Sequence, residues 1–332
     1  MDALFPDFFI TPILQKRYGL RERQRVLIIY DESKAGIGES FVEAAKRISP
    51  HVKVFRLGEE RFSEKNLAAL LIEIKSGRYS LFVNLFEARP APEERQARMR
   101  IITAQKDKKR FRIAHCPGIT EAMLENIDFD AMGDKAHKLH AILKGAKYIN
   151  VTTPLGTNLE LLVKGRRSHD DVFPKSRDLS NLPGGEIFLA PKETGANGVL
   201  VVNGTAGDFG ILSSPLKFTI KDGQIIDLCW NDPNYNNSLL ETIRKALFQD
   251  KEASVIGELG IGLAPYSLCG LMLQDEKAAG TIHIAFGGNA LFGGMNKTTK
   301  SHIDFLVTGP ELTVHYADGS ARIIMRNGEL IL

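Results

Sequence analysis

Residues of the types that bind metal ions gather in one glycine-rich stretch, residues 257–306. The stretch contains the segments GELGIG, DEKAAGTIHIAFGGN and FGGMNKTTKSHIDFL, which read as short strands separated by glycine turns. They contribute two carboxylates and two imidazoles, namely Glu258, His283, His302 and Asp304. A mixed set of oxygen and nitrogen ligands suits zinc, manganese, cobalt or iron(II).

The spacing of these residues limits which of them can share an ion. Successive side chains of a strand point to opposite faces, so His302 and Asp304 lie on one face and could bind one ion, or one ion each. His283 is flanked by Ile282 and Ile284, which would pack into one layer and turn the imidazole to the other side. A histidine inside a strand is more often a hydrogen-bonded core residue. The spacing alone is therefore compatible both with a metal site and with histidines that are hydrogen-bonded in the core.

A third carboxylate, Glu186, enters an apolar strand directly after a Pro-Gly-Gly turn in NLPGGEIFLAP. It must face solvent or pair with a cation or metal ion, because burying a lone carboxylate is prohibitively costly. With Glu186 the chain offers five potential ligands, enough for two ions with open positions. Such a centre polarises a carbonyl and activates water, and a further glutamate would ordinarily serve as general base.

The composition is that of an ordinary globular protein, and 332 residues exceed what one core usually holds, so two domains are expected. A net charge of +3 argues against a nucleic-acid partner.

The N-terminus lacks the pattern of a signal peptide, and no apolar run is long enough to cross a membrane. Three scattered cysteines without a C-x-x-C pair indicate a reducing compartment, and we interpret them as buried apolar residues. We expect a cytoplasmic protein without a membrane partner.

The first half alternates apolar runs with helical patterns, which predicts an α/β domain over residues 1–155 with a parallel sheet covered by helices on both faces. The expected strands are 26–30, 52–57, 80–85, 112–115 and 148–153, and the expected helices 39–48, 63–75, 93–108 and 119–145. The turn DESKAGIGES has neither of the glycine patterns that bind nucleotides.

From residue 156 to 332, short apolar runs alternate with turn signals, which predicts a β-rich α+β domain that carries the metal site. Lys221, Asp222 and Gly223 should form a hairpin turn between strands 216–220 and 224–230. One helix is expected at 237–248. We interpret Arg166 and Arg167 as ordinary surface charge.

The motifs of the second half, taken together, resemble those of a known family. NLPGGEIFLAP, GELGIG, DEKAAGTIHIAFG and SHIDFLV look like successive motifs of the aminopeptidase T family of thermophilic-type, leucyl aminopeptidase-like metallo-aminopeptidases. The resemblance implies a centre of two zinc, cobalt or manganese ions, removal of N-terminal residues from peptides, and a homodimer. It also implies the metal ligands Glu186, Glu258, His283, His302 and Asp304, with Glu186 and Glu258 acting in catalysis.

The chain departs from that family at three positions. Gly185 precedes Glu186 where the family usually has a second acid, so the general base is missing from this motif. Ala290 stands in place of a tyrosine ligand, and Asn158 in place of an aspartate.

These departures leave two other functions open. The same fold resembles that of 2,5-dihydroxypyridine dioxygenases, which cleave an aromatic ring with a single iron(II). His283 or Glu258, together with His302 and Asp304, could hold such an ion. His115, at the end of a predicted strand, would then be a candidate for proton transfer, although a turn histidine with a backbone hydrogen bond is the simpler interpretation. The third possibility is a relative that binds peptides for recognition or maturation without cleaving them.

Overall fold

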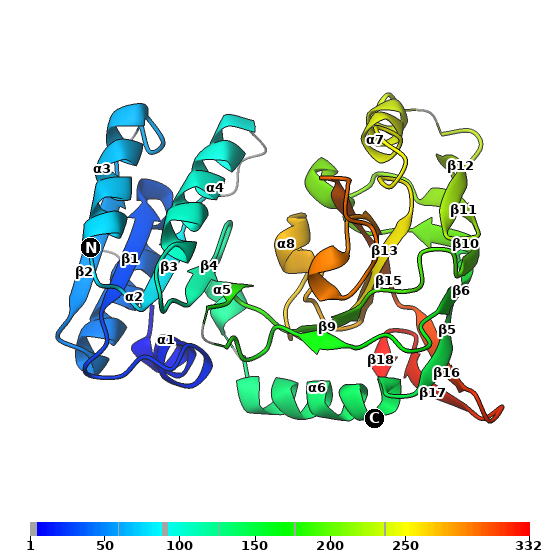
Figure 1. Cartoon of the computed structure of the whole chain (residues 1–332), viewed down its shortest axis with the longest axis horizontal. Helices are drawn as coiled ribbons and strands as arrows, with labels where there is room; N and C mark the ends of the chain where they lie inside the picture. Colours follow the sequence, from blue (N-terminus) through cyan, green and yellow to red (C-terminus); the bar gives the residue numbers. More distant parts are fainter. Residues whose placement is uncertain (1–4, 59, 88–91, 126, 176, 236) are drawn as a thin grey trace. The chain divides into compact units, whose positions relative to one another are not determined.

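The computed structural model describes residues 5–58, 60–87, 92–125, 127–175, 177–235 and 237–332. Its contacts divide the chain into two compact units (Figure 1). Unit 1 comprises Met1–Phe129 and Asp171–Gly184, and unit 2 comprises Asp130–Asp170 and Gly185–Leu332. The predicted combination of a parallel α/β part and a β-rich part is confirmed.

Unit 1 is built on a parallel sheet with the strand order β2-β1-β3-β4-β8. Its strands are β1 (Val26–Asp31), β2 (Val52–Leu57), β3 (Leu81–Leu85), β4 (Ile113–His115) and β8 (Leu179–Asn181). All six residues of β1 are buried, which is the state expected of a central parallel strand with both faces covered.

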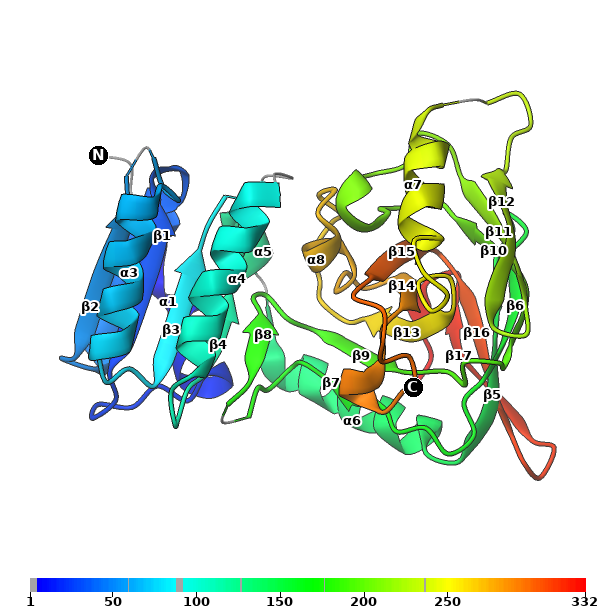
Figure 2. The same ribbon diagram turned by 45° about the horizontal axis from the view of Figure 1, so that its top comes forward.

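Helices cover both faces of this sheet (Figures 1 and 2). They are α1 (Asp7–Pro12), α2 (Ala35–Ile48), α3 (Glu64–Ser76), α4 (Pro92–Lys106) and α5 (Glu121–Leu124). The helices α3 and α4 pack on the face that includes Leu27 and Phe82. The helix α2 lies on the opposite face, where Gly38 leaves room for the ring of Tyr30.

Unit 2 contains two antiparallel sheets. The eight-stranded sheet has the order β12-β11-β10-β6-β5-β16-β17-β18 and the five-stranded sheet the order β15-β14-β13-β9-β7. The strands of the larger sheet are β5 (Ala146–Thr152), β6 (Asn158–Leu162), β10 (Ala196–Val202), β11 (Leu216–Lys221), β12 (Gln224–Trp230), β16 (Glu311–Tyr316), β17 (Ala321–Arg326) and β18 (Glu329–Leu330). Those of the smaller sheet are β7 (His169–Asp170), β9 (Glu186–Leu189), β13 (Ile256–Gly262), β14 (Thr281–Gly287) and β15 (His302–Thr308). The helices of this unit are α6 (Phe129–Leu143), whose first residue is the last of unit 1's first segment, α7 (Leu239–Leu247) and α8 (Met272–Asp275).

An aromatic core joins the two sheets of unit 2. The ring of Phe218 on β11 lies 5.4 Å from that of Phe286 on β14 and 4.9 Å from that of Phe305 on β15. All three side chains are fully buried. Because strand side chains alternate, this packing commits one face of the five-stranded sheet to the core and leaves the other face for polar residues.

Several predicted elements differ from the observed ones. The strand expected at 148–153 is β5, which pairs antiparallel with β6 and β16 and so belongs to the larger sheet of unit 2, not to the parallel sheet. The helix expected at 119–145 is two helices, because the chain turns extended at Glu125. Of the cysteines, Cys116 is buried as predicted, whereas Cys229 is partly exposed and Cys269 is exposed.

The predicted hairpin turn between β11 and β12 is confirmed. Asp222 and Gly223 both have positive φ, which is the conformation that a tight two-residue hairpin requires. Within the described ranges, no helix has the length and apolar character needed to cross a membrane.

Candidate metal centre

The five-stranded sheet of unit 2 brings the predicted ligands together. Glu186 lies on β9, Glu258 on β13, His283 on β14, and both His302 and Asp304 on β15, and these four strands are neighbours in the sheet. The strand register pairs Gly260 with His283 and Ala285 with Asp304, so the five side chains share the face opposite the aromatic core.

The small residues on this face leave room for the functional side chains. A Cβ atom added to Gly260 would lie 2.0 Å from Cε1 and 2.2 Å from Nε2 of His283. The imidazole therefore occupies the space that any side chain at position 260 would fill. Gly260 of the GELGIG motif is thus a packing requirement of the site.

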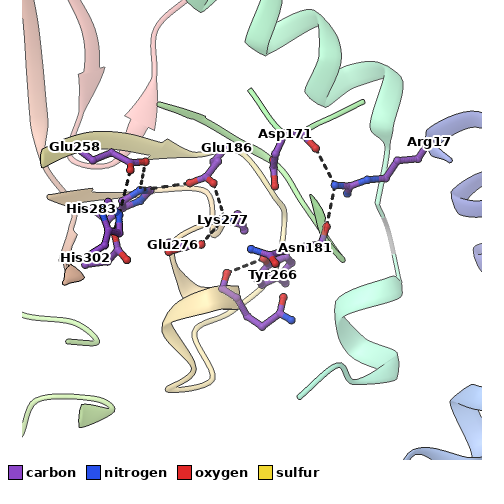
Figure 3. Close-up of polar contacts among 12 residues, drawn as sticks. Arg17, Asp171, Asn181, Glu186, Glu258, Tyr266, Glu276, Lys277, His283 and His302 are labelled. Atoms are coloured by element: carbon purple, nitrogen blue, oxygen red, sulfur yellow. Dashed lines mark hydrogen bonds and ion pairs between the residues drawn. The ribbon is translucent and has the colours of Figure 1, made fainter. Parts of the chain in front are cut away.

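Glu258 lies between the two imidazoles (Figure 3). Its Oε1 is 3.3 Å from Nε2 of His283, and its Oε2 is 3.3 Å from Nε2 of His302. Nε2 of His283 is also 3.4 Å from Oε2 of Glu186, and Nε2 of His302 is 3.4 Å from Oδ1 of Asp304. The nitrogen and oxygen atoms joined by these four distances form a continuous series of ligand-type atoms from β9 to β15.

Among the described residues, three groups that draw on these five ligands and on Glu276 have ligand atoms within 4.8 Å of one another, and each group contains one imidazole and two carboxylates. The groups are Glu186, Glu258 and His283; Glu258, His302 and Asp304; and Glu276, His283 and Asp304. Glu258 belongs to the first two groups and so can serve as a ligand shared between two ions.

The site is strongly polarised because charged groups are buried together. Burial acts to lower the pKa of His283, but the hydrogen bond with Glu258 and the charges of Glu186, Glu258 and Asp304 raise it to about 10. Burial acts to raise the pKa of Asp304, but the charge and hydrogen bond of His302 lower it to about 2. Burial also acts to lower the pKa of His302, but Asp304 and Glu258 raise it well above its ordinary value, so both imidazoles favour a positive charge where they face the carboxylates.

The donor set fits divalent metal ions. Two ligand atoms that each lie about 2.1 Å from a tetrahedral ion are about 3.4 Å apart, which matches the observed separations better than a hydrogen bond of about 2.9 Å does. Nδ1 of His302 donates to the carbonyl of Gly288 at 2.7 Å, so Nε2 is directed at the carboxylates. A backbone carbonyl on the second nitrogen is the usual support of a metal-bound histidine.

Two residues of this cluster, Glu276 and Lys277, are not among the ligands that the sequence predicts. They follow α8, and both are buried. Lys277 donates from Nζ to Oε1 of Glu186 at 2.5 Å and also pairs with Oε1 of Glu276 (Figure 3). The signal that could have revealed them is DEK, three consecutive charged residues that precede the apolar strand of His283 by only three small residues.

The candidate catalytic residue His115 lies in unit 1, at the end of β4, and the three ligand groups consist of residues of unit 2. Burial and the charge of Arg98 lower the pKa of His115 to about 3, and its Nδ1 has no hydrogen-bond partner among the described residues.

The interpretation of Arg166 as surface charge is wrong. Its side chain is 7% exposed and pairs with Glu193.

The chain thus combines a parallel α/β unit with a β-rich unit that carries a cluster of carboxylates and imidazoles able to hold metal ions. The chain belongs to the thermophilic metalloprotease (M29) family, whose model matches residues 127–330. That match covers the five-stranded sheet and every residue of the three ligand groups.

Individual relatives agree with this assignment. Aminopeptidase PepS from Streptococcus thermophilus is 25% identical over an alignment of 176 residues, and the match covers 46% of this chain and 41% of the relative. The matched part therefore spans about two fifths of the curated relative's length.

Two solved structures share the fold over nearly the whole chain. AmpT from Thermus thermophilus aligns with a TM-score of 0.72 at 17% identity and covers 98% of both chains. The 2,5-dihydroxypyridine dioxygenase from Pseudomonas putida aligns with a TM-score of 0.66 at 18% identity, covering 98% of this chain and 96% of its own. At these identities the two structures establish the fold alone.

Proposed function

We propose that this protein is a metallo-aminopeptidase that removes N-terminal residues from peptides with a centre of two divalent ions. The observation that carries the proposal is the position of Glu258, whose two oxygens face two different imidazoles at 3.3 Å. Glu186, Glu258 and His283 would hold one ion, and Glu258, His302 and Asp304 the other. Zinc, cobalt or manganese suits this set of oxygen and nitrogen ligands.

When bound, two such ions would polarise the carbonyl of the first peptide bond and make a water molecule more acidic. The protein would supply the remaining steps. Glu276 is our candidate for the general base, because burial raises the pKa of its carboxyl and it lies within the ligand group of His283 and Asp304. It would replace the second acid of the family motif, at the position where this chain has Gly185. Glu186 and Glu258 would act as ligands rather than as proton acceptors.

The test combines metal content with a substrate comparison. The protein should carry about two ions per chain by elemental mass spectrometry and release amino acids from unblocked peptides but not from the same peptides with an acetylated N-terminus. His302→Ala should abolish the release, whereas His315→Ala is the matched control, because His315 stacks on Tyr148 in the larger sheet. Two ions without release of amino acids would refute the peptidase assignment.

The ring-cleaving dioxygenase is the second candidate, supported by the likeness of the fold to the Pseudomonas putida enzyme. A single iron(II) in such chemistry is ordinarily held by two histidines and one carboxylate. In the described part of the chain, each ligand group has one imidazole and two carboxylates, which favours the hydrolase. One iron per chain and oxygen consumption with a hydroxylated aromatic ring would reverse this order.

The third candidate, a peptide-binding protein, predicts no ion even after reconstitution and a rise in stability when peptide is added. The spacing within the cluster argues against it, because separations of 3.3 and 3.4 Å between imidazole nitrogens and carboxylate oxygens fit ligands of a shared ion better than direct hydrogen bonds. His115 would have a proton-transfer role only in the dioxygenase reading. The homodimer and the cytoplasmic location remain predictions, and sedimentation of the purified protein tests the first of them.

A further inference from the structure

The ammonium group of Lys277 lies beside the ligands of the first proposed ion, and it is almost completely buried. Its side chain is 1% exposed, and those of its partners Glu186 and Glu276 are 9% and 11% exposed. A buried ammonium is costly unless carboxylates compensate it, and here two do so. The ion pairs of Lys277 with Glu186 and Glu276 are thus part of the buried site.

The backbone around Lys277 is fixed by several hydrogen bonds. Its carbonyl accepts from the amide of Ala264 at 2.8 Å, and its own amide donates to the carbonyl of Gln274 at 3.0 Å. The neighbouring Asp275 accepts from the amides of Cys269 and Gly270 at 2.7 and 2.9 Å. A rigid main chain therefore presents the lysine, which makes the position of its ammonium group well defined.

A glycine on β13 allows this segment to approach Glu186. Gly262 pairs with Glu186 across β13 and β9, and a Cβ atom added to Gly262 would lie 2.0 Å from the carbonyl oxygen of Ala278. The main chain at 277–278 therefore packs directly against the strand beside Glu186. This contact explains how the lysine reaches the centre of the site.

The two oxygens of Glu186 have different surroundings. Oε1 accepts from Nζ of Lys277 at 2.5 Å, whereas Oε2 lies 3.4 Å from Nε2 of His283. A carboxylate can bind an ion through one oxygen or through both. With Oε1 held by the ammonium, only Oε2 faces the ligand group of His283 and Glu258.

We propose that Lys277 is a positioning residue that restricts Glu186 to one metal-binding oxygen and so keeps a coordination position of the first ion open for water and the substrate. The inference rests on the proposed metal centre. The lysine would then have two opposite effects. Its ammonium group repels a nearby divalent ion and so weakens binding of the ion. It also preserves the open position that hydrolysis requires.

The test is Lys277→Met, which keeps the apolar bulk of the stem and removes the charge. Cobalt(II) is the probe, because its visible absorption weakens as its coordination number rises. In the variant, Glu186 should bind through both oxygens, so the absorption per bound ion falls. Affinity for cobalt should rise by about threefold or more, because the repulsion is gone, while kcat for an unblocked peptide falls.

Two further variants keep the test decisive. Lys221→Met is the matched control, because Lys221 is exposed on β11, and its cobalt affinity and spectrum should equal those of the wild type. Lys277→Gln retains a hydrogen-bond donor without the charge, and circular dichroism shows whether each variant folds. If Lys277→Met does not fold, Lys277→Gln should show the same direction of change in affinity and absorption.

The outcomes separate this inference from the proposed function. An unchanged spectrum and affinity in a folded Lys277 variant would overturn the inference alone, and so would a loss of cobalt affinity, since that indicates only a structural role. A wild-type protein that binds no ion would overturn both. A wild-type protein that binds ions without cleaving peptides, together with the predicted spectral change, would overturn the peptidase assignment and support the positioning role.

Discussion

The imidazole of His283 lies directly against the main chain of Gly260, its partner on the neighbouring strand, so that a Cβ atom at position 260 would be 2.2 Å from Nε2. Side-chain atoms cannot approach a Cβ so closely, and the ring would have to move. Because Nε2 is the atom that faces Glu186 and Glu258, the glycine controls the geometry of the first ligand group.

Gly260→Ala should therefore weaken metal binding while the fold survives. We expect affinity for zinc to fall by about 10- to 100-fold, the usual range when the support of a metal ligand is disturbed. Competition with a chromogenic chelator measures the change. Gly36→Ala is the control, because a Cβ atom there meets nothing within 4 Å. Equal zinc affinity in both variants would show that His283 is not a ligand.

Removal of individual carboxylates should change the number of bound ions in a defined way. Glu258 belongs to both proposed groups, whereas Asp304 belongs only to the second of them. After dialysis against metal-free buffer, Asp304→Asn should retain about one ion per chain and Glu258→Gln clearly fewer, because the shared ligand supports both sites. Both variants should lose activity. Native mass spectrometry counts the ions, and equal loss in the two variants would argue against a shared Glu258.

The parts of the site that sequence analysis predicted are those with strict periodicity. His302 and Asp304 share a face because side chains alternate along a regular strand, and β15 pairs with β14 without a register shift. Glu186 was found because a carboxylate at the start of an apolar strand needs a partner, and the structure pairs it with Lys277. Its ammonium partner was missed, because the segment around α8 is too short to show a period.

The pairing of strands that lie far apart along the chain could not be predicted from the sequence either. The apolar run of β5 looks like the next strand of a parallel sheet, yet its partners are β6 and β16, and β16 lies far along the chain. The hairpins were predictable because their turns are local, as at Asp222 and Gly223. The approach of residues 277–278 to Gly262 depends on tertiary packing that no local pattern encodes.

The loop that leads to His302 is held by Glu193, a partly buried acid. Glu193 accepts from the amide of Met295 at 2.6 Å and from the side chain of Asn289 at 3.1 Å, and it pairs with Arg166. Burial acts to raise the pKa of Glu193, but hydrogen bonds from its own amide, Met295 and Asn289, and then the charge of Arg166, lower it. The network thus stabilises residues 288–301, which include the carbonyl of Gly288 that orients His302.

Glu193→Gln should loosen this loop and weaken the second ligand group. We expect amide hydrogen exchange over residues 288–301 to accelerate by about tenfold, which corresponds to a loss of about 1.4 kcal/mol of local stability. Glu241→Gln on α7 is the matched control, because that side chain is 71% exposed. Unchanged exchange in the Glu193 variant would show that backbone contacts alone hold the loop.

His115 should make the protein sensitive to acid. The folded protein keeps this imidazole neutral, since burial and Arg98 lower its pKa to about 3, whereas the unfolded chain takes up a proton near the ordinary value of 6.5. Unfolding therefore binds a proton between these two values. Its contribution to stability is complete above pH 6.5 and is lost as the pH falls toward 3, by at most about 1.4 kcal/mol per pH unit.

His115→Phe removes this titration and keeps a ring beside Phe86, whose centroid is 6.2 Å from that of the imidazole. Urea unfolding of the metal-free protein from pH 7.5 to 4.5 measures the effect, since chelation removes any contribution from ion release. The difference in stability between the variant and the wild type should grow in favour of the variant as the pH falls below 6.5. His137→Phe, at an exposed position of α6, should follow the wild-type curve. Parallel curves for the wild type and His115→Phe would mean that the buried imidazole gains a partner on protonation, which the contacts around it do not suggest.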